Sequence, residues 1–341
     1  MYSNFIRRIP PGLRLENRAL MVNLGIWVEL TLCEQASKYS AWGVPINYEG
    51  QGRLMIAQTF GAIDKRVADS HVLRARSRIG KYRIEKKIAQ GGFATVYQAW
   101  DTIEGIHVAL KMPHSYIVTA SMLDAFQREA RLIAKLEHPN ILGLKDASFI
   151  DGRFVIASRL GAQTLATRLK HRVGLATALS YIEQLIQAVA YAHRNRIIHC
   201  DIKPENLILL SDGRLQLTDF GIAKVASRTI AHTMVASGSG TVGYMAPEQA
   251  MGRPSARSDV FAIGVLAYRI LTGTLPEWPY DWPPKGVATL KRKVHPELTE
   301  MLRKAMYPRP SQRYQDANVL LRTFLPAKRK TLRMRSENCR G

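Results

Sequence analysis

The sequence is poor in cysteine and lacks any apolar run long enough to cross a membrane. Its 3 cysteines are far apart, form no Cys-x-x-Cys pair and leave one over if two are joined, so neither a disulfide framework nor a zinc site is predicted. The longest apolar runs, 20–32 and 260–271, each contain a charged residue and are shorter than the ~20 residues that span a bilayer. We therefore expect no membrane span and a cytoplasmic location.

Acidic residues are also scarce, with 27 Asp and Glu against 49 Lys and Arg, which gives a formal net charge of +22. Such a charge favours acidic or phosphate-rich partners. Outside the basic segment 327–336, however, acidic residues are scattered among the basic ones and no aromatic residues alternate with them. Nucleic acid is therefore not expected as the main ligand, and any binding of it would reside in the termini.

Residues 1–78 show no clear pattern. They contain several glycines and prolines and only weak helical periodicity at 13–37, and a basic stretch follows at 74–83. Three alternatives stay open for this segment: a small extra domain, a disordered arm, or a start of translation placed too far upstream.

Between Tyr82 and Ile156, short runs rich in β-branched and aromatic residues alternate with turn signals. A helical pattern at 120–137 interrupts them and gathers its apolar residues on one face. This part predicts a sheet accompanied by one long helix. The predicted strands have the sequences YRIEKKI, ATVYQAW, HVALKM and RFVIAS.

After Thr164 helical patterns dominate. A short hairpin, NLILL and RLQLTDF around Asp212-Gly213, is the exception. The sequence therefore predicts an α+β protein with a small β lobe, a larger helical lobe and a cleft between them. The predicted helices are 176–195, 257–271, 296–306 and 311–324.

Phosphate chemistry is suggested first by the stretch IAQGGFATVY at 88–97. A glycine turn between strands allows backbone N–H groups to approach phosphates, although an isolated Gly-Gly is more often an ordinary hairpin. Lys111 ends the following strand, and Glu129 lies eighteen residues further on. A carboxylate at that position in the sequence could hold the Lys111 ammonium group and direct it at phosphate oxygens.

The stretch HCDIKPENLIL at 199–209 concentrates polar groups in one loop. Asp201 suits accepting a proton from a hydroxyl, and Lys203 suits neutralising a phosphate. Asn206 and the Asp219 of an Asp-Phe-Gly turn offer the oxygen ligands that Mg²⁺ prefers. These residue types together predict a magnesium–nucleotide site.

From Tyr82 to about residue 325 the ordered set of motifs resembles the eukaryotic-type serine/threonine protein kinases. Further matches are HPNI, GTVGYMAPE, SDVFAIGVL and RPSQRY. The resemblance implies a bilobal kinase fold that transfers the γ-phosphoryl group of ATP to serine or threonine hydroxyls of proteins. The implied organisation is an extension at 1–78, a kinase domain at 79–325 with lobes at 79–158 and 159–325, and a disordered basic tail at 326–341.

The resemblance also implies a role for each motif residue, with ATP and Mg²⁺ as cofactors and Mn²⁺ as an alternative metal. Ala157 falls at the gatekeeper position, where so small a side chain is expected to open a pocket behind the nucleotide. The implied catalytic residues are Asp201, Lys203, Lys111, Glu129 and Thr241; the implied nucleotide-binding residues are Ile88, Ala89, Gly91, Gly92, Val96, Ala109, Lys111, Ser158, Leu160 and Ile208; the implied metal ligands are Asn206 and Asp219.

Three further residues match architectural positions of the family. Glu248 and Arg313 match a buried ion pair that braces the substrate-binding segment, and Asp259 matches an aspartate that anchors the backbone of the catalytic loop. The Trp/Pro-rich stretch 275–284 is interpreted as a rigid loop packed on the helical lobe, with a docking surface as the alternative.

Two departures from the family pattern affect regulation and nucleotide binding. Only Gly91 remains of the glycine triplet, because alanine stands at residues 89 and 94. Cys200 replaces the arginine that usually receives the activation-loop phosphate, and a neutral thiol cannot make that ion pair. Phosphorylation of Thr229, Thr233, Ser237 or Ser239 is therefore not expected to switch activity on through this position.

Other functions compete with an active kinase. A pseudokinase scaffold would be expected to lack at least one of the phosphate, metal or proton-accepting residues, and all are present. A small-molecule phosphotransferase of related fold would lack the Ala-Pro-Glu segment, which this chain has. Cys200 itself is interpreted as an inert filler rather than a reactive thiol, because the adjacent Asp201 opposes thiolate formation.

Overall fold

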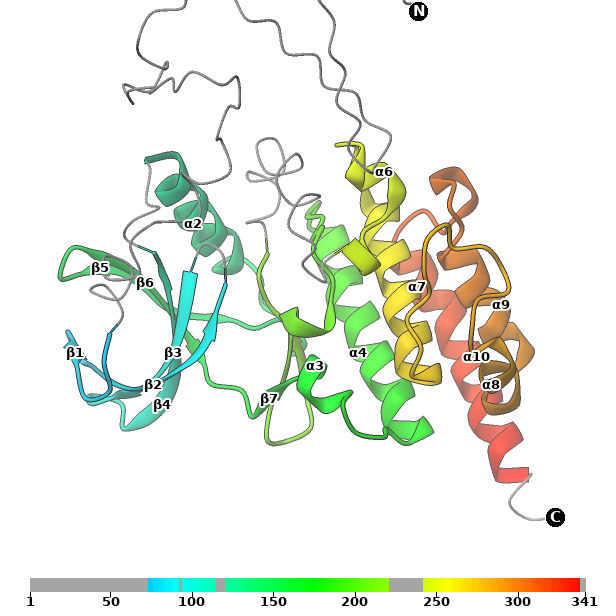
Figure 1. The fold of residues 1–341 in the computed structure, drawn as a ribbon, viewed down its shortest axis with the longest axis horizontal. Coiled ribbons are helices and arrows are strands. Elements are labelled where there is room, and N and C mark those ends of the chain that lie inside the picture. Colours follow the sequence, from blue (N-terminus) through cyan, green and yellow to red (C-terminus); the bar gives the residue numbers. More distant parts are fainter. Residues whose placement is uncertain (1–72, 92–93, 115–119, 221–241, 338–341) are drawn as a thin grey trace, which may run out of the picture. The chain divides into compact units, whose positions relative to one another are not determined.

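The computed structural model describes residues 73–91, 94–114, 120–220 and 242–337 (Figure 1). The first described lobe is built on an antiparallel sheet with the strand order β1-β2-β3-β4-β6-β5. Helix α2 (Ala120–Ile133) accompanies this sheet. The strands are β1 (Arg78–Ile79), β2 (Tyr82–Gln90), β3 (Ala94–Asp101), β4 (Ile106–Pro113), β5 (Leu144–Ile150) and β6 (Arg153–Arg159).

Alternation along β4 separates the two faces of the sheet. Val108, Leu110 and Met112 are buried in one hydrophobic cluster, and Ala109 and Lys111 point to the opposite face. On that opposite face, residues of β6 pack against α2 in a second cluster. The helix therefore covers the same face from which Lys111 projects.

The second described lobe is mainly helical (Figure 1). Its centre is α7, whose residues from Ser258 to Tyr268 are all buried. A three-stranded sheet, β7-β8-β9, precedes it. The elements are β7 (Gln163–Thr164), α3 (Leu165–Arg168), α4 (Leu175–Arg194), β8 (Leu207–Leu209), β9 (Leu215–Leu217), α6 (Pro247–Ala250), α7 (Ala256–Thr272), α8 (Val287–Lys293), α9 (Pro296–Ala305) and α10 (Ala317–Glu337).

The predicted α+β class, strands, long helix and hairpin are confirmed. The prediction missed β5, an edge strand whose residues are half-buried and whose LKDASFI sequence does not alternate in polarity. It also began the last helix too early: a short 3-10 turn occupies Pro310–Gln312, and α10 begins at Ala317. Residues 1–72 lie outside the described residues.

The prediction of a disordered tail from residue 326 is wrong for residues 326–337, because α10 continues to Glu337. Pro326 stands inside this helix, where its missing N–H would be expected to end it. Burial offsets that cost: Ala327 is 1% exposed and Thr331 is 0% exposed, one helical turn apart on the same face. The Thr331 hydroxyl also accepts a hydrogen bond from the His295 N–H at 3.1 Å, just before α9.

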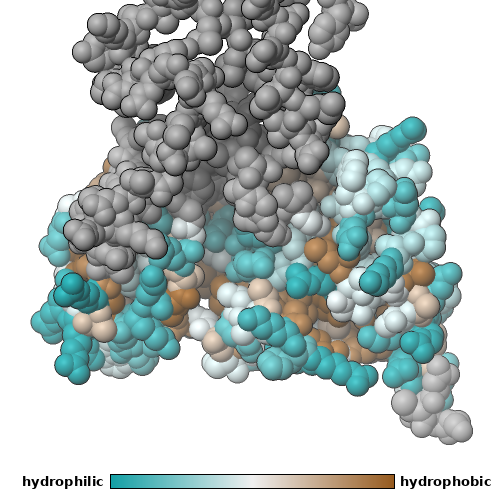
Figure 2. Space-filling model, viewed as in Figure 1, coloured by the Kyte–Doolittle hydropathy of each residue, from teal (hydrophilic) through white to brown (hydrophobic). Residues whose placement is uncertain are grey.

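The Trp/Pro-rich loop packs on the helical lobe as predicted, with one exception. Leu275, Tyr280 and Trp282 contact the main hydrophobic core, and Tyr280 stacks edge-on against Phe261. Trp278, by contrast, is 69% exposed. On the face drawn in Figure 2, hydrophilic residues cover much of the described surface, and hydrophobic ones show between them on both lobes.

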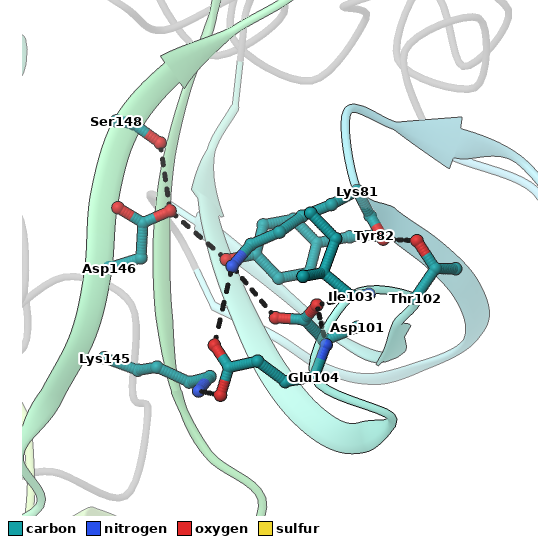
Figure 3. A network of polar contacts seen from close by, with 9 residues as sticks. All are labelled: Lys81, Tyr82, Asp101, Thr102, Ile103, Glu104, Lys145, Asp146 and Ser148. Carbon is teal, nitrogen blue, oxygen red and sulfur yellow. Dashed lines mark hydrogen bonds and ion pairs between the residues drawn. The ribbon is translucent and has the colours of Figure 1, made fainter.

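A polar network fixes the turn between β3 and β4 against β5 (Figure 3). The Lys81 ammonium lies 3.0 Å from Asp101 Oδ2 and 3.6 Å from Glu104 Oε1, and Glu104 also pairs with Lys145. Burial alone would raise the pKa of Asp101, but backbone N–H groups of Glu104 and Ile103 together with Lys81 hold it below its usual value. The network holds together the side of the sheet that carries no catalytic motif.

Within the ranges that the structure describes, no helix is long and apolar enough to cross a bilayer.

Candidate active site

Three of the predicted nucleotide-binding side chains come from three different strands. Val96 in β3 lies opposite Lys111 in β4, and Ala109 precedes Lys111 by two residues, so all three share one face of the sheet. Ile208 comes from β8 in the other lobe. A Cβ built on Gly161 would lie 2.0 Å from Ile208 Cγ2, so only glycine allows the segment after β6 to pass this close.

The glycine turn joins β2 to β3. Ala89 pairs with Val96, and the Gly91 N–H donates to the Ala94 carbonyl at 2.9 Å. Ile88 is 44% exposed. Gly92 lies outside the described residues, and Ser158 and Leu160 lie at the end of β6 and directly after it. These placements agree with a phosphate-facing turn, and the nucleotide contacts of these residues stay a prediction.

The gatekeeper prediction for Ala157 is wrong. Ala157 is paired with Leu110 and is buried in the cluster on the far face of the sheet. Ile156 is paired with Lys111 instead and packs in the cluster with Phe126 of α2. Because neighbouring strand residues point to opposite faces, an error of one position exchanged a small side chain for a large one. The expected pocket behind the nucleotide does not follow.

The Lys111 ammonium lies between two carboxylates. It is 3.2 Å from Glu129 Oε1 and makes a closer ion pair with Asp219 Oδ1. Burial lowers the pKa of Lys111, but both carboxylates more than offset this and raise it above its usual value. Burial would likewise raise the pKa of Asp219, and the charge of Lys111 holds it below its usual value.

Glu129 is the member of this cluster whose charge is least well compensated. It is 3% exposed, and its Oε2 atom is buried without a hydrogen-bond partner in the described part of the chain. Burial, only partly offset by Lys111 and reinforced by the charge of Asp219, raises the pKa of Glu129 to about 7. Leaving a buried acceptor unpaired costs stability, so this arrangement favours a neutral Glu129 at mildly acid pH.

We expect this pKa to appear in the pH dependence of stability. A folded-state pKa of about 7, above the ordinary value of 4.5, means that the folded protein binds the proton more tightly. The stabilisation is therefore present below pH 4.5 and is lost as pH rises to 7, by roughly 3 kcal/mol. Chemical denaturation between these pH values should show a smaller decline for Glu129→Gln than for the wild type. The exposed Glu137→Gln is the matched control, and an unchanged slope in Glu129→Gln would contradict the prediction.

The catalytic-loop residues converge on one carboxylate. Asp201 Oδ2 lies 2.9 Å from the Lys203 ammonium and accepts a hydrogen bond from Asn206 Nδ2 at 2.8 Å. Asn206 Nδ2 also donates to the Asp201 carbonyl at 2.8 Å, which closes the loop on itself. The structure thus brings together Asp201, Lys203 and Asn206, as the sequence predicted.

Asp259 in α7 binds the backbone of the catalytic loop. Its Oδ2 accepts from the His199 N–H and its Oδ1 from the Cys200 N–H, both at 2.8 Å. His193 Nε2 lies 2.9 Å from the same Oδ2. Cys200 has φ +66°, a left-handed conformation that is unfavourable for a side chain with a Cβ. The aspartate therefore holds the residue before Asp201 in a strained shape.

Two oxygen atoms suit a divalent cation. Asn206 uses its Nδ2 in hydrogen bonds and leaves Oδ1 without a partner among the described residues, and Asp219 leaves its Oδ2. The Thr218 N–H donates to the Asn206 carbonyl at 3.0 Å, which keeps the two ligands adjacent. The described residues contain no group of three or more His, Cys, Asp or Glu side chains that could hold a metal ion by themselves. The donors fit Mg²⁺, which takes few protein ligands and completes its shell with water and phosphate oxygens.

The predicted ion pair under the substrate-binding segment is present and bidentate. Arg313 Nη1 and Nη2 lie 2.7 and 3.0 Å from Glu248 Oε1 and Oε2. The same guanidinium donates to the carbonyl groups of Tyr307, Arg257 and Pro308, so its donors are satisfied within the protein. Thr241 and the predicted phosphorylation sites of the activation segment lie outside the described residues.

Sequence reasoning gave His199 and Gln249 no role. His199 accepts the Asp201 N–H through Nδ1, contacts the Thr218 carbonyl through Nε2 and stacks edge-on against Phe220. Gln249 Nε2 donates to the Cys200 carbonyl at 2.5 Å. Both residues join the catalytic loop to neighbouring segments. The His199-x-Asp201 spacing could have indicated a role for His199, whereas no sequence pattern pointed to Gln249.

Comparison with known proteins decides the family. The protein kinase domain model matches residues 82–339. The chain belongs to the protein kinase family. A probable serine/threonine-protein kinase of Clostridium acetobutylicum is 32% identical over 261 residues, covering 71% of this chain and 39% of that protein. Serine/threonine-protein kinase PrkC of Bacillus subtilis is 37% identical over 203 residues, covering 58% of this kinase and 31% of PrkC.

Solved kinase structures share the fold. The PknI kinase domain of Mycobacterium tuberculosis matches 75% of this kinase with a TM-score of 0.59 at 22% identity. A structure described as PpkA-294 in its apo form matches 74% with a TM-score of 0.63 at 20% identity. This kinase thus spans well under half the length of the two curated relatives named above, 39% and 31%, and nearly all of these two solved domains, 99% of each.

Proposed function

We propose that this kinase transfers the γ-phosphoryl group of ATP to serine or threonine hydroxyls of protein substrates, in the cytoplasm and with Mg²⁺ as the metal. The observation that carries the proposal is the convergence of Lys203 and Asn206 on the Asp201 carboxylate, 2.9 and 2.8 Å away. A second group, Lys111 with Asp219, supports it from the other side of the nucleotide site. A pseudokinase would have no use for either arrangement.

Each residue has a task in this reaction. Asp201 accepts the acceptor's proton while the bond from the hydroxyl oxygen to the γ-phosphorus forms. The bond from that phosphorus to the β,γ-bridging oxygen breaks at the same time, and ADP leaves with its electron pair. Lys203 and Lys111 neutralise phosphate charge, and Asn206 and Asp219 would hold the metal. When bound, the metal supplies positive charge at the β- and γ-phosphate oxygens.

The experiment that tests this function is phosphate transfer from labelled ATP with Mg²⁺ to a generic basic protein. Phosphosite mapping should find the label on serine or threonine. Lys111→Met should transfer roughly 100-fold more slowly, because it removes one positive group from the phosphates. If the wild type transfers no more label than Lys111→Met, or if the label resides on tyrosine, the proposal is wrong.

We further propose that activity does not depend on an activation-loop phosphate held by the catalytic loop. Cys200 is 8% exposed and its N–H is bound by Asp259, so the position offers neither charge nor space to a phosphate. Replacing Thr229, Thr233, Ser237 and Ser239 together by alanine should leave the rate of transfer within about twofold of the wild type. A loss of activity in this variant that phosphatase treatment of the wild type reproduces would contradict the prediction.

A further inference from the structure

A surface pocket lies behind the catalytic loop, where α4 ends and α7 and α10 begin. These three helix ends point to the same side of the helical lobe in Figure 1. The pocket has a volume of about 400 Å³, which is in the range of small-molecule sites. Its lining includes His193, Arg196, Arg257, Gln315 and Asp316. None of these residues belongs to the proposed phosphoryl-transfer site.

The pocket carries an excess of positive charge. Its two guanidinium groups, from Arg196 and Arg257, form no ion pair or side-chain hydrogen bond with any residue that the structure describes. The only carboxylate in its lining is Asp316, whose Oδ1 already accepts the Val319 N–H at 2.9 Å in the first turn of α10. The N-terminal ends of α7 and α10 add further positive potential. An anion is therefore the complementary ligand.

A missing acceptor points the same way. The Nε–H of Arg257 is buried and has no hydrogen-bond partner among the residues that the structure describes. Buried donors are nearly always paired, so this N–H is an unmet hydrogen bond beside the pocket, and a small turn of the Arg257 side chain toward an anion in the pocket would satisfy it. Water could supply one acceptor, but it would leave the charge of both arginines uncompensated.

We propose that this pocket binds a phosphate-bearing anion between Arg196 and Arg257. A guanidinium group can donate two parallel hydrogen bonds to two oxygens of one phosphate. A tetrahedral phosphate has more oxygens and a larger negative charge than a carboxylate, so it can face two guanidinium groups at once. The shared chemistry is a phosphate monoester or inorganic phosphate. Its source is either a free ion or a phosphorylated side chain of a protein.

The position of the pocket links its ligand to the catalytic loop. The Arg257 carbonyl accepts a hydrogen bond from Arg313 at 3.0 Å, and Asp259, two residues later, holds the loop backbone. On the pocket's other wall, His193 contacts Asp259 at 2.9 Å. An anion that fixes Arg257 therefore steadies the start of α7, and amide exchange at residues 199 and 200 should slow when phosphate is bound.

The test is titration of the full chain with sodium phosphate, and separately with O-phosphoserine, monitored by calorimetry at constant ionic strength. Arg257→Gln and Arg196→Gln should each weaken phosphate binding about tenfold, because each removes a charge-assisted contact. Arg292→Gln, on exposed α8, is the matched control and should bind as the wild type does. All variants keep the nucleotide site, so phosphate bound there contributes equally and cancels.

Each result decides the proposal. Equal affinity for both probes identifies a free ion as sufficient, and tighter binding of O-phosphoserine identifies a phosphorylated side chain; both support the site. The proposal is overturned if the heat of binding is the same for phosphate and acetate. It is also overturned if the heat of phosphate binding is the same in the wild type and in the variant that carries both Arg196→Gln and Arg257→Gln. If Arg257→Gln fails to fold, Gln315→Glu serves instead, because residue 315 is exposed and the new carboxylate places a negative charge at the rim of the pocket. Undiminished phosphate affinity in Gln315→Glu also overturns the proposal.

Discussion

Asp201→Asn should lower kcat for phosphate transfer by about 10²–10⁴-fold, the range by which a positioned general base accelerates a reaction. The amide keeps the size of the carboxylate, and its oxygen still accepts the hydrogen bond that Asn206 donates at 2.8 Å. It cannot take up a proton from the acceptor hydroxyl, and it no longer attracts the Lys203 ammonium 2.9 Å away. The chemical step should therefore fail while the loop keeps its shape.

The measurement is steady-state transfer together with nucleotide binding by calorimetry. ATP affinity should stay within about threefold of the wild type, because only interactions made in the transition state are removed. Asp212→Asn, at the exposed turn between β8 and β9, is the matched control and should transfer phosphate normally. Equal loss of activity and of nucleotide affinity in Asp201→Asn would assign this residue to binding rather than to chemistry.

The order of the motifs predicted the site well because each motif is local. In HCDIKPEN, the residues that meet at Asp201 are at most five positions apart, so the loop itself sets their geometry. Lys111 and Glu129 are eighteen residues apart, but a strand followed by a helix on the same face of the sheet brings them within 3.2 Å. The separation of the two residues along the chain, together with the family resemblance, was sufficient to predict that contact.

Other features depend on contacts that no local pattern records. Ala157 and Ile156 are neighbours, and only the pairing of β4 with β6 decides which of them faces Lys111. The helix beyond Pro326 exists because Ala327 and Thr331 are buried against the rest of the lobe. In both cases tertiary packing overrode a local signal, from motif spacing in the first and from proline in the second.

The shape of the catalytic loop is the clearest example of a distant cause. Cys200 and Asp219 both have positive φ, at 66° and 65°, yet neither is the glycine that normally marks this conformation. Through its family resemblance, the sequence could predict that Asp259 anchors the catalytic loop. It could not predict that the anchor holds a left-handed residue, which costs about 1 kcal/mol or more and needs support from elsewhere in the fold.

That anchor makes Asp259→Asn a severe substitution, with an expected loss of roughly 3 kcal/mol of unfolding free energy. The carboxylate accepts hydrogen bonds from the His199 and Cys200 N–H groups and contacts His193, and it is 1% exposed. An asparagine has a single oxygen, so one of its sides must present an NH₂ group to a buried N–H donor. The released loop should also misplace Asp201, and kcat should fall roughly 100-fold.

Thermal unfolding, hydrogen exchange and steady-state transfer together check this prediction. The melting temperature should fall by roughly 6–12 °C for a domain of this size, and amides at residues 199–201 should exchange faster than those of α4. Asp281→Asn, an exposed aspartate in the loop before α8, is the matched control and should change neither quantity. A variant that loses stability but keeps kcat would show that Asp259 supports only the helical core. A variant that loses kcat with the loop amides still protected would place its effect outside the loop backbone.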